Sequence, residues 1–236
     1  SVDIGTVKTR ILVSEVCGDG EIKIIGAVAN PSSGVSKGRV ADPEKLSEVL
    51  RLSREEAERM SGVEIEGACV SVSNAGIRSF DSRGMLTIAS GDEGVTGDHI
   101  SEVTRNAQNI PLPSDRMVLH AIKQFFTVDG EGSIVNPLGM KAGRLERDLH
   151  IVTILKEHFR ALERVLKSCG IEMSETAFTP ISVSNLALNY TDREEGTLII
   201  DIGGYVTSYA YYYSLLIGLR GLMLVRGFNF SRVIEF

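Results

Sequence analysis

The sequence predicts an α/β protein with a mixed sheet and covering helices, because two distant stretches repeat one strand-and-turn pattern with helices and further strands between them. In the first, Val2-Asp3-Ile4-Gly5-Thr6-Val7-Lys8, an acidic residue ends a short apolar strand and a Gly-Thr turn opens a second strand. In the second, residues 197–204, an apolar strand again ends in Asp201-Ile202-Gly203. Such a pair is expected where two similar lobes face each other and clamp a nucleotide phosphate chain.

The residues of both turns favour a bound phosphate chain. Gly5 lets the backbone approach an anion, Thr6 adds a hydroxyl and Lys8 adds a positive charge. Asp3 and Asp201 are carboxylates suited to holding Mg²⁺ through water. The predicted nucleotide-binding set is Asp3, Gly5, Thr6, Lys8, Asp201, Gly203, Gly204 and Thr207, and no catalytic residue is assigned. Two alternatives stay open, since the same pattern is often only a tight turn and a strand-edge lysine is often only solvated.

Composition indicates a soluble globular protein. Of 236 residues, 43% are hydrophobic and 24% are charged, which suffices for one large domain or two modest ones. A net charge of -6 without a basic stripe argues against nucleic acid as a partner. Cys17, Cys69 and Cys169 lack metal-like spacing and fit reduced thiols in a cytoplasm. The most apolar window, residues 205–219, is too short to span a membrane.

Turn and capping signals divide the chain before residue 74. Three successive strands are expected first, the last over residues 21–27, and a glycine-rich loop follows over residues 31–40. Asp42 is the expected N-cap of a helix that ends at Gly62. Its inner side is expected to carry Leu46, Val49, Leu50, Ala57 and Met60, and residues 63–72 return as a strand.

From about Asn74 to Leu155 the pattern predicts a compact α+β insertion. Short strands, including residues 85–88, precede a helix that presents Ile100, Val103, Ala107 and Ile110 on one face and stops at Pro111. Strands are expected over residues 117–128 and 149–155. The charged residues Arg144, Glu146, Arg147 and Asp148 fit either a subunit contact or an exposed charged strand end.

The remaining chain alternates helices and strands. Helices are expected over residues 156–169 and from Thr179 to about Leu188, before the second Asp-Ile-Gly strand. A last hairpin is expected over residues 207–213 and 219–225. Four tyrosines of this hairpin are predicted to lie on the surface of the sheet and not to form a platform for ring stacking: Tyr209, Tyr211, Tyr212 and Tyr213.

Six stretches together resemble the FtsA family of actin-like bacterial cell-division proteins. The Asn-Pro-Leu-Gly-Met run is the most specific, because nothing in nucleotide chemistry requires it. The stretches are residues 3–8, 33–40, 55–62, 128–130, 136–140 with 144–146 and 150–153, and 201–204, and they extend over the whole chain.

The resemblance implies an actin-like (ribonuclease-H-like) fold with an inserted 1C-like α+β subdomain and an incomplete second lobe. The implied domains are 1–73, the first part of actin-like domain IA; 74–153, the inserted 1C-like domain; 154–196, the second part of IA; and 197–236, the start of domain IIA. The implied ligands are ATP and Mg, held between the lobes, with the nucleotide acting as a conformational switch and with weak or no ATPase activity.

The implied role is that of a self-assembling scaffold in the cytoplasm, at the inner face of the cell membrane at the division site. Implied partners are further copies of the chain in a filament, the tubulin-like division-ring protein FtsZ, and later division proteins that contact the 1C-like domain. Peripheral membrane contact is implied through a segment outside this sequence. Nucleic acid is not an implied partner.

The second turn departs from the family pattern. The family sequence at this turn is Asp-Ile-Gly-Gly-Gly-Thr-Thr-Asp. In residues 201–208, Tyr205 replaces the third glycine, Val206 replaces the first threonine and Ser208 replaces the final aspartate. Farther on, Arg226-Gly227 followed by Ser231 and Val233 stand where the family has Gly-Gly, Thr and Asp. A side chain at position 205 places bulk where the backbone should approach phosphate, so nucleotide affinity or hydrolysis is expected to be affected.

Two other functions remain as alternatives. One is a pilus-assembly scaffold of the PilM type, which shares the inserted domain and lacks the Asn-Pro-Leu-Gly-Met run. The other is a small-molecule kinase or ATPase of the actin fold, which would need a general base facing a substrate cleft. No residue with supporting motifs fills that role in the sequence.

Overall fold

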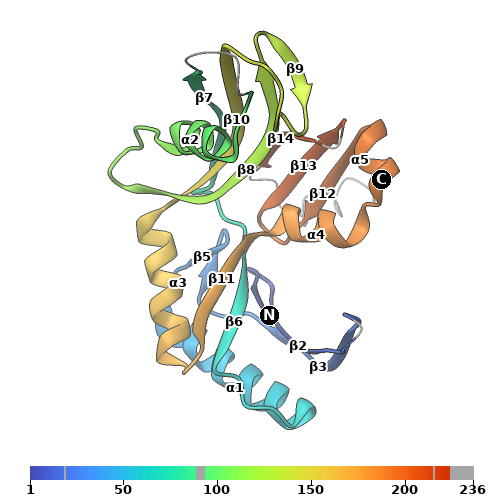
Figure 1. The fold of residues 1–236 in the computed structure, drawn as a ribbon. Coiled ribbons are helices and arrows are strands. Elements are labelled where there is room, and N and C mark those ends of the chain that lie inside the picture. Colours follow the sequence, from blue (N-terminus) through green and yellow to red (C-terminus); the bar gives the residue numbers. More distant parts are fainter. Residues whose placement is uncertain (19, 89–93, 215, 224–236) are drawn as a thin grey trace, which may run out of the picture.

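The computed structural model describes residues 1–18, 20–88, 94–214 and 216–223, and these form three larger sheets and one short hairpin (Figure 1). The first sheet has the strand order β11-β6-β1-β2-β3. Strands β1 (Val2–Ile4), β2 (Lys8–Val16) and β3 (Ile22–Pro31) form an antiparallel meander. Strands β6 (Gly67–Val72) and β11 (Glu172–Phe178) continue the sheet in parallel with β1. The predicted mixed sheet is therefore confirmed.

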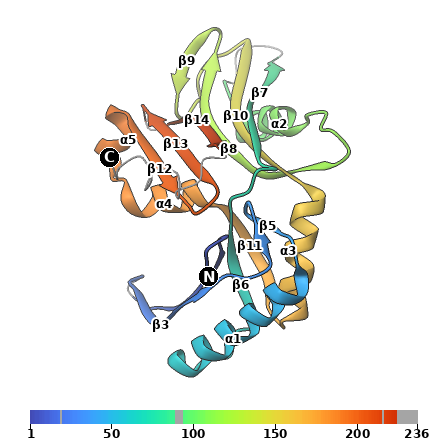
Figure 2. The ribbon, with the colours of Figure 1, turned by 180° about the vertical axis from the view of Figure 1, so that it is seen from behind.

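Two helices, α1 (Pro43–Ser61) and α3 (Lys156–Ser168), pack side by side against this sheet (Figure 2). As predicted, the Asp42 side chain accepts a hydrogen bond from the amide of Lys45 at 3.2 Å, and Gly62 ends α1 at φ 72°. Leu46, Leu50 and Ala57 are fully buried. Met60 was predicted to lie with them and is 57% exposed, because it falls about 60° away from that stripe in the last turn.

The second sheet has the order β7-β10-β8-β9 and carries α2 (Gly97–Gln108) on one face. Its strands are β7 (Arg78–Thr87), β8 (Arg116–Val128), β9 (Glu131–Ile134) and β10 (Arg144–Leu155). Strand β7 is longer than predicted and β9 was not predicted, since the glycines at 84 and 132 were interpreted as breaks. Strand β10 begins at Arg144, five residues before the predicted start.

Two residues of the charged run in β10, Glu146 and Arg147, are buried. β10 lies between β7 and β8 in the sheet, and Glu146 and Arg147 are only 6% and 7% exposed. Glu146 forms ion pairs with Arg144 at 2.6 Å and Arg83 at 3.1 Å. The Arg147 guanidinium lies 3.8 Å from the ring centre of Phe126. The exposed-strand-end interpretation was therefore wrong for these two residues.

The third sheet has the order β12-β13-β14, with β12 (Thr197–Ile202), β13 (Thr207–Tyr213) and β14 (Leu216–Met223). Two helices, α4 (Thr179–Ala187) and α5 (Tyr190–Glu195), precede it and contact β13. Tyr212 is 1% exposed, contrary to the prediction of a surface tyrosine, because the Arg193 guanidinium of α5 lies 5.4 Å from its ring centre. Residues 224 and 225 of the predicted last strand lie outside the described residues.

A two-stranded hairpin, β4 (Val35–Ser36) and β5 (Arg39–Val40), occupies part of the segment predicted as a loop. Its turn residues Lys37 and Gly38 have φ values of 52° and 71°, as a tight hairpin turn requires. A side chain on Gly38 would overlap the carbonyl of Ser73, so the hairpin lies directly against the chain leaving β6. Among the described helices, none has the length and apolar character needed to cross a membrane.

We expect Gly84→Ala to lower the free energy of unfolding by about 1–3 kcal/mol. Gly84 lies in β7, and an added Cβ would overlap the backbone of Val103 and Ala107 in α2. Thermal unfolding would measure the change. The control is Gly97→Ala at the start of α2, where an added Cβ meets nothing within 4 Å. Equal melting temperatures for the two variants would contradict the close packing of α2 on β7.

Candidate functional site

The two Asp-Ile-Gly turns form hairpins of the same build. Ile4 pairs with Thr9 and Ile202 pairs with Thr207, so four residues lie between the paired positions in each hairpin. The Gly5 amide donates to the Lys8 carbonyl at 3.0 Å, and the Gly203 amide donates to the Val206 carbonyl at 3.0 Å. Position by position, Asp3 therefore corresponds to Asp201, Thr6 to Gly204, Lys8 to Val206 and Arg10 to Ser208.

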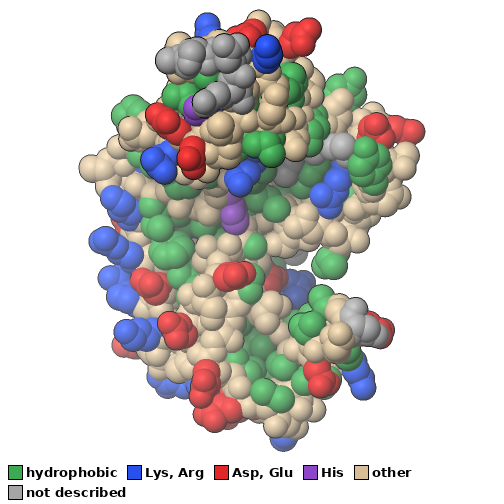
Figure 3. All heavy atoms as spheres, viewed as in Figure 1, with side chains coloured by type: hydrophobic (Ala, Val, Ile, Leu, Met, Phe, Trp, Pro, Cys, Tyr) green, Lys and Arg blue, Asp and Glu red, His purple; other side chains and the backbone are tan. Residues whose placement is uncertain are grey.

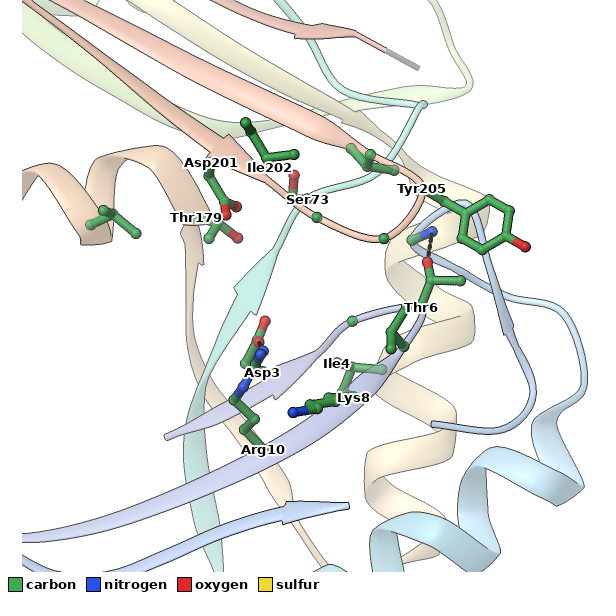
Figure 4. Close-up of a pocket in the computed structure, with 17 residues that line it drawn as sticks. Asp3, Ile4, Thr6, Lys8, Arg10, Ser73, Thr179, Asp201, Ile202 and Tyr205 are labelled. Carbon is green, nitrogen blue, oxygen red and sulfur yellow. Dashed lines mark hydrogen bonds and ion pairs between the residues drawn. The ribbon is translucent and has the colours of Figure 1, made fainter. Parts of the chain in front are cut away.

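The hairpins face each other across a cleft of about 760 Å³ (Figure 4). In the space-filling view the surface is hollowed between α4 and the β2–β3 hairpin (Figure 3). This volume is in the range of ordinary small-molecule sites. The residues that line the cleft are Asp3, Ile4, Gly5, Thr6, Val7, Lys8, Arg10, Gly38, Ser73, Thr179, Val183, Asp201, Ile202, Gly203, Gly204, Tyr205 and Val206.

Seven of the eight residues in the predicted nucleotide-binding set thus lie together. Thr207, the eighth, does not line the cleft; it is 2% exposed and pairs with Ile202 inside the third sheet. Arg10, Ser73 and Thr179 line the cleft and were not predicted. Strand alternation could have indicated Arg10, because it lies two residues after Lys8 and so on the same face of β2. Ser73 directly follows β6 and Thr179 directly follows β11, so their places in the cleft depend on the order of strands in the sheet.

Glycines in the two turns allow the backbone to pack closely, both within a hairpin and between the hairpins. A side chain on Gly204 would overlap Cγ2 of Val7, so the tip of the second hairpin rests on the tip of the first. A Cβ on Gly5 would lie 2.9 Å from the Lys8 carbonyl oxygen, which is too close. Because the Gly5 and Gly203 amides both close their own hairpins, phosphate contacts would have to come from other groups of the two turns.

The Thr6 hydroxyl connects the first hairpin to the β4–β5 hairpin. The Gly38 amide donates to Thr6 Oγ1 at 3.1 Å, the bond drawn in Figure 4. Since the hydroxyl oxygen accepts this bond, its own proton can be directed to an acceptor in the cleft. Thr6 is therefore placed both to hold the hairpin and to contact a ligand.

The two cleft carboxylates have different surroundings. Asp3 Oδ2 accepts from Arg10 Nη1 at 2.8 Å, and Asp3 Oδ1 accepts from the Ser71 hydroxyl at 2.6 Å. Asp201 Oδ2 accepts from the Ser208 hydroxyl at 3.3 Å. Burial raises the pKa of the Asp201 carboxyl above its ordinary value, and the nearby charge of Asp3 adds to this, while Ser208 and Arg10 oppose it.

These carboxylates fit a hydrated Mg²⁺ better than one bound directly. Both Asp3 oxygens already accept hydrogen bonds, so an ion bound directly would compete with the Arg10 and Ser71 donors for this carboxylate. Within the described ranges, no three His, Cys, Asp or Glu side chains come together as a metal site. Mg²⁺ keeps several of its waters in most sites of this kind, which suits a contact made through water.

The second-turn residues that differ from the family pattern, Tyr205, Val206 and Ser208, lie in different environments. Tyr205 lines the cleft edge, and its ring points away from the cleft centre (Figure 4). Val206 is 8% exposed, and Ser208 is fully buried beneath Asp201. The second hairpin thus presents backbone and an acidic group, whereas the first presents an acidic group, a hydroxyl and two cations. Arg226, Gly227, Ser231 and Val233 lie outside the described residues.

Two facing hairpins of one build, each continuing a mixed or antiparallel sheet, agree with the predicted actin-like fold. A PilM-PilN type IV pilus biogenesis complex is similar, with a TM-score of 0.66 and 14% identity over 99% of this chain and 63% of the other. The ethanolamine utilization protein EutJ from Carboxydothermus hydrogenoformans has a TM-score of 0.52 and 16% identity over 99% of this chain and 54% of its own. At these identities the similarity concerns the fold.

Sequence comparisons identify the particular relatives. Residues 74–153 match the family described as the SHS2 domain inserted in FtsA. Cell division protein FtsA of Pseudomonas aeruginosa is 32% identical over 89% of this chain and 50% of its own length. FtsA of Bacillus subtilis is 30% identical over 90% of this chain and 48% of its own. The chain is a relative of FtsA, as its motifs predicted, and spans about half the length of the curated relatives it matches.

We expect Asp201→Asn to raise the melting temperature at pH 7 by about 2–4 °C. Burial raises the folded-state pKa, so the charged carboxylate opposes folding above the ordinary pKa of a carboxyl group. This penalty grows until the pH passes the folded-state value, and it is absent at more acidic pH, where Asp201 is protonated in both states. The gain should therefore shrink on acidification.

Thermal unfolding between pH 4 and pH 7 would measure this difference, with Asp115→Asn, at an exposed carboxylate outside the cleft, as the control. A gain for Asp201→Asn that is independent of pH would contradict the burial of charge.

Proposed function

We propose that the cleft binds ATP with Mg²⁺ and that the nucleotide acts as a conformational switch in an actin-like cell-division scaffold. The observation that carries this proposal is the convergence of the two equivalent hairpins on one cleft, with Asp3, Lys8 and Arg10 on one side and Asp201 on the other. A ligand that is both strongly anionic and associated with a cation matches this mixture of charges. The relationship to FtsA supports a role in cell division.

The described side chains suggest how a phosphate chain would be held. Lys8 and Arg10 would supply positive charge, and the Thr6 hydroxyl would donate to a phosphate oxygen. Asp3 and Asp201 would accept hydrogen bonds from the water shell of Mg²⁺, whose contribution is to neutralise phosphate charge. Gly203 and Gly204 would allow the backbone to approach the ligand, and a supporting role for Thr207 would be indirect, through the strand.

Weak or absent ATPase activity fits the same geometry. A general base must reach the attacking water or hydroxyl and be free to take its proton. The Asp3 carboxylate is already held by Arg10 and Ser71, and Asp201 is held by buried Ser208 where the family pattern has an acid. We therefore infer binding and release of nucleotide as the main activity.

The scaffold role would involve several contacts. We propose self-assembly into filaments, a link to the tubulin-like ring protein FtsZ, and contact of the inserted 1C-like segment, residues 74–153, with later division proteins. The proposed location is the cytoplasmic face of the cell membrane at the division site, with peripheral membrane contact. We also propose the domain division 1–73, 74–153, 154–196 and 197–236. Each of the three larger sheets has most of its strands in one of these domains.

A pilus-assembly scaffold is the second candidate, because a PilM-PilN complex shares the fold across nearly the whole chain. Its sequence identity of 14% is well below the 32% of the FtsA protein from Pseudomonas aeruginosa. The family match of residues 74–153 also concerns FtsA. We therefore favour the cell-division role.

Nucleotide binding tests the site. With a fluorescent ATP analogue and Mg²⁺, we expect Lys8→Met and Asp201→Ala each to weaken equilibrium binding at least about ten-fold, because each removes a charged contact. Asp115→Ala, outside the cleft, should bind as the unaltered protein does. Full affinity in both cleft variants would exclude this cleft as the nucleotide site.

Assembly and turnover distinguish a scaffold from an enzyme. We expect ATP with Mg²⁺ to increase the fraction of protein that sediments in the ultracentrifuge, because the nucleotide would bias the relation of the two lobes. Phosphate release should stay unchanged when sugars or other small hydroxyl acceptors are added. Release that rises with an acceptor, without any change in sedimentation, would favour the kinase alternative instead.

A further inference from the structure

We propose that Arg10 is the fixed positive charge that neutralises Asp3 in the cleft: it shields Asp3 from direct coordination by divalent cations and thereby reduces the dependence of polyphosphate binding on metal. The part of this inference that concerns nucleotide rests on the proposed function. The part that concerns divalent cations stands on the geometry of Asp3 and Arg10.

The pairing of Arg10 with Asp3 is set by the backbone. The two residues are directly opposite each other in the antiparallel pair β1–β2, so the register of the sheet holds their side chains on one face. Arg10 Nη1 lies 2.8 Å from Asp3 Oδ2. The remaining oxygen, Oδ1, accepts from the Ser71 hydroxyl of β6 at 2.6 Å. Both oxygens of this carboxylate therefore have protein donors, and a cation would have to compete with them.

The second hairpin lacks a comparable shield. At the position equivalent to Arg10 it has Ser208, which is neutral, fully buried and hydrogen-bonded to Asp201 at 3.3 Å. Across the described part of the chain, no Lys, Arg or His side chain lies within ion-pair distance of Asp201. The two equivalent acids thus differ: one is neutralised by the chain itself, and the other is left for a cation.

The balance of charge in the cleft depends on Arg10. Among the described lining residues, the charged groups are Asp3 and Asp201 against Lys8 and Arg10, which is a neutral set. Without Arg10 the set is negative and would repel a polyphosphate unless a metal ion compensates. The Arg10 side chain is 55% exposed, so its other N–H groups remain accessible from the cleft. Arg10 can therefore hold Asp3 and face a phosphate at the same time.

A divalent cation alone tests the shield without nucleotide. Titration with Mn²⁺, followed by electron paramagnetic resonance, should show binding at least about ten-fold tighter in Arg10→Met than in the unaltered protein, because the Asp3 carboxylate becomes open to the ion in addition to that of Asp201. Arg10→Lys should stay close to the unaltered protein, and Asp3→Asn in the Arg10→Met background should abolish the gain. Lys23→Met, the same loss of charge on β3 outside the cleft, is the matched control.

The nucleotide arm compares affinity for the fluorescent ATP analogue with Mg²⁺ and with a chelator. Arg10→Met should lose at least about ten-fold in the chelator and less than about three-fold with Mg²⁺. Equal losses in both conditions would make Arg10 a simple phosphate contact and overturn the proposal. Unchanged Mn²⁺ binding and unchanged affinities would make the pair an ordinary surface ion pair, and would also overturn it.

The two proposals fail in different ways. If the unaltered protein binds no nucleotide under either condition, the proposed function fails, while the Mn²⁺ titrations still decide the role of Arg10. If nucleotide binds and Arg10→Met alters neither measurement, the inference fails and the proposed function stands. Melting temperatures of all variants would show that each is folded.

Discussion

The contact between the two hairpin tips is the constraint on which the cleft depends. Val7 of the first hairpin rests on Gly204 of the second so closely that any side chain at position 204 would overlap it. This contact joins the five-stranded sheet to the three-stranded sheet, which share no paired strands among the described residues. Because each hairpin is closed by its own amide-to-carbonyl bond, both arrive at the contact as rigid turns. The acidic residues behind the tips are thereby set on two sides of one space (Figure 4).

That arrangement places the negative charge of Asp201 in a partly buried position, which lowers the stability of the folded state. Burial raises the pKa of Asp201, and the nearby charge of Asp3 acts in the same direction. A carboxylate kept in such a position despite its cost is typical of sites that bind a ligand. Arg10 relieves part of the repulsion from one side, which makes the first hairpin the better neutralised of the two.

The same hairpin also lies at the root of the inserted segment. The Thr6 hydroxyl accepts from Gly38, and Gly38 lies against Ser73 and Asn74, where the chain leaves β6 for the second sheet. Asn74 in turn contacts the His158 ring at 3.2 Å, where the chain has returned into α3. Burial lowers the pKa of His158, and the charge of Arg39 adds to this, so the ring is neutral at physiological pH. The cleft and the inserted unit therefore share one continuous set of contacts.

Local sequence signals were sufficient to predict the elements and the motifs. Caps at Asp42 and Gly62, the alternation in the strands and the repeated Asp-Ile-Gly turns are local signals, and they predicted most elements, the mixed sheet and seven residues that line the cleft. The environment of each residue, by contrast, follows from how the elements pack together. Burial of Glu146, Arg147 and Tyr212, the exclusion of Thr207 from the cleft, and the entry of Ser73 and Thr179 all depend on which strands become neighbours. Strand order joins residues far apart in the chain, and no local pattern encodes it.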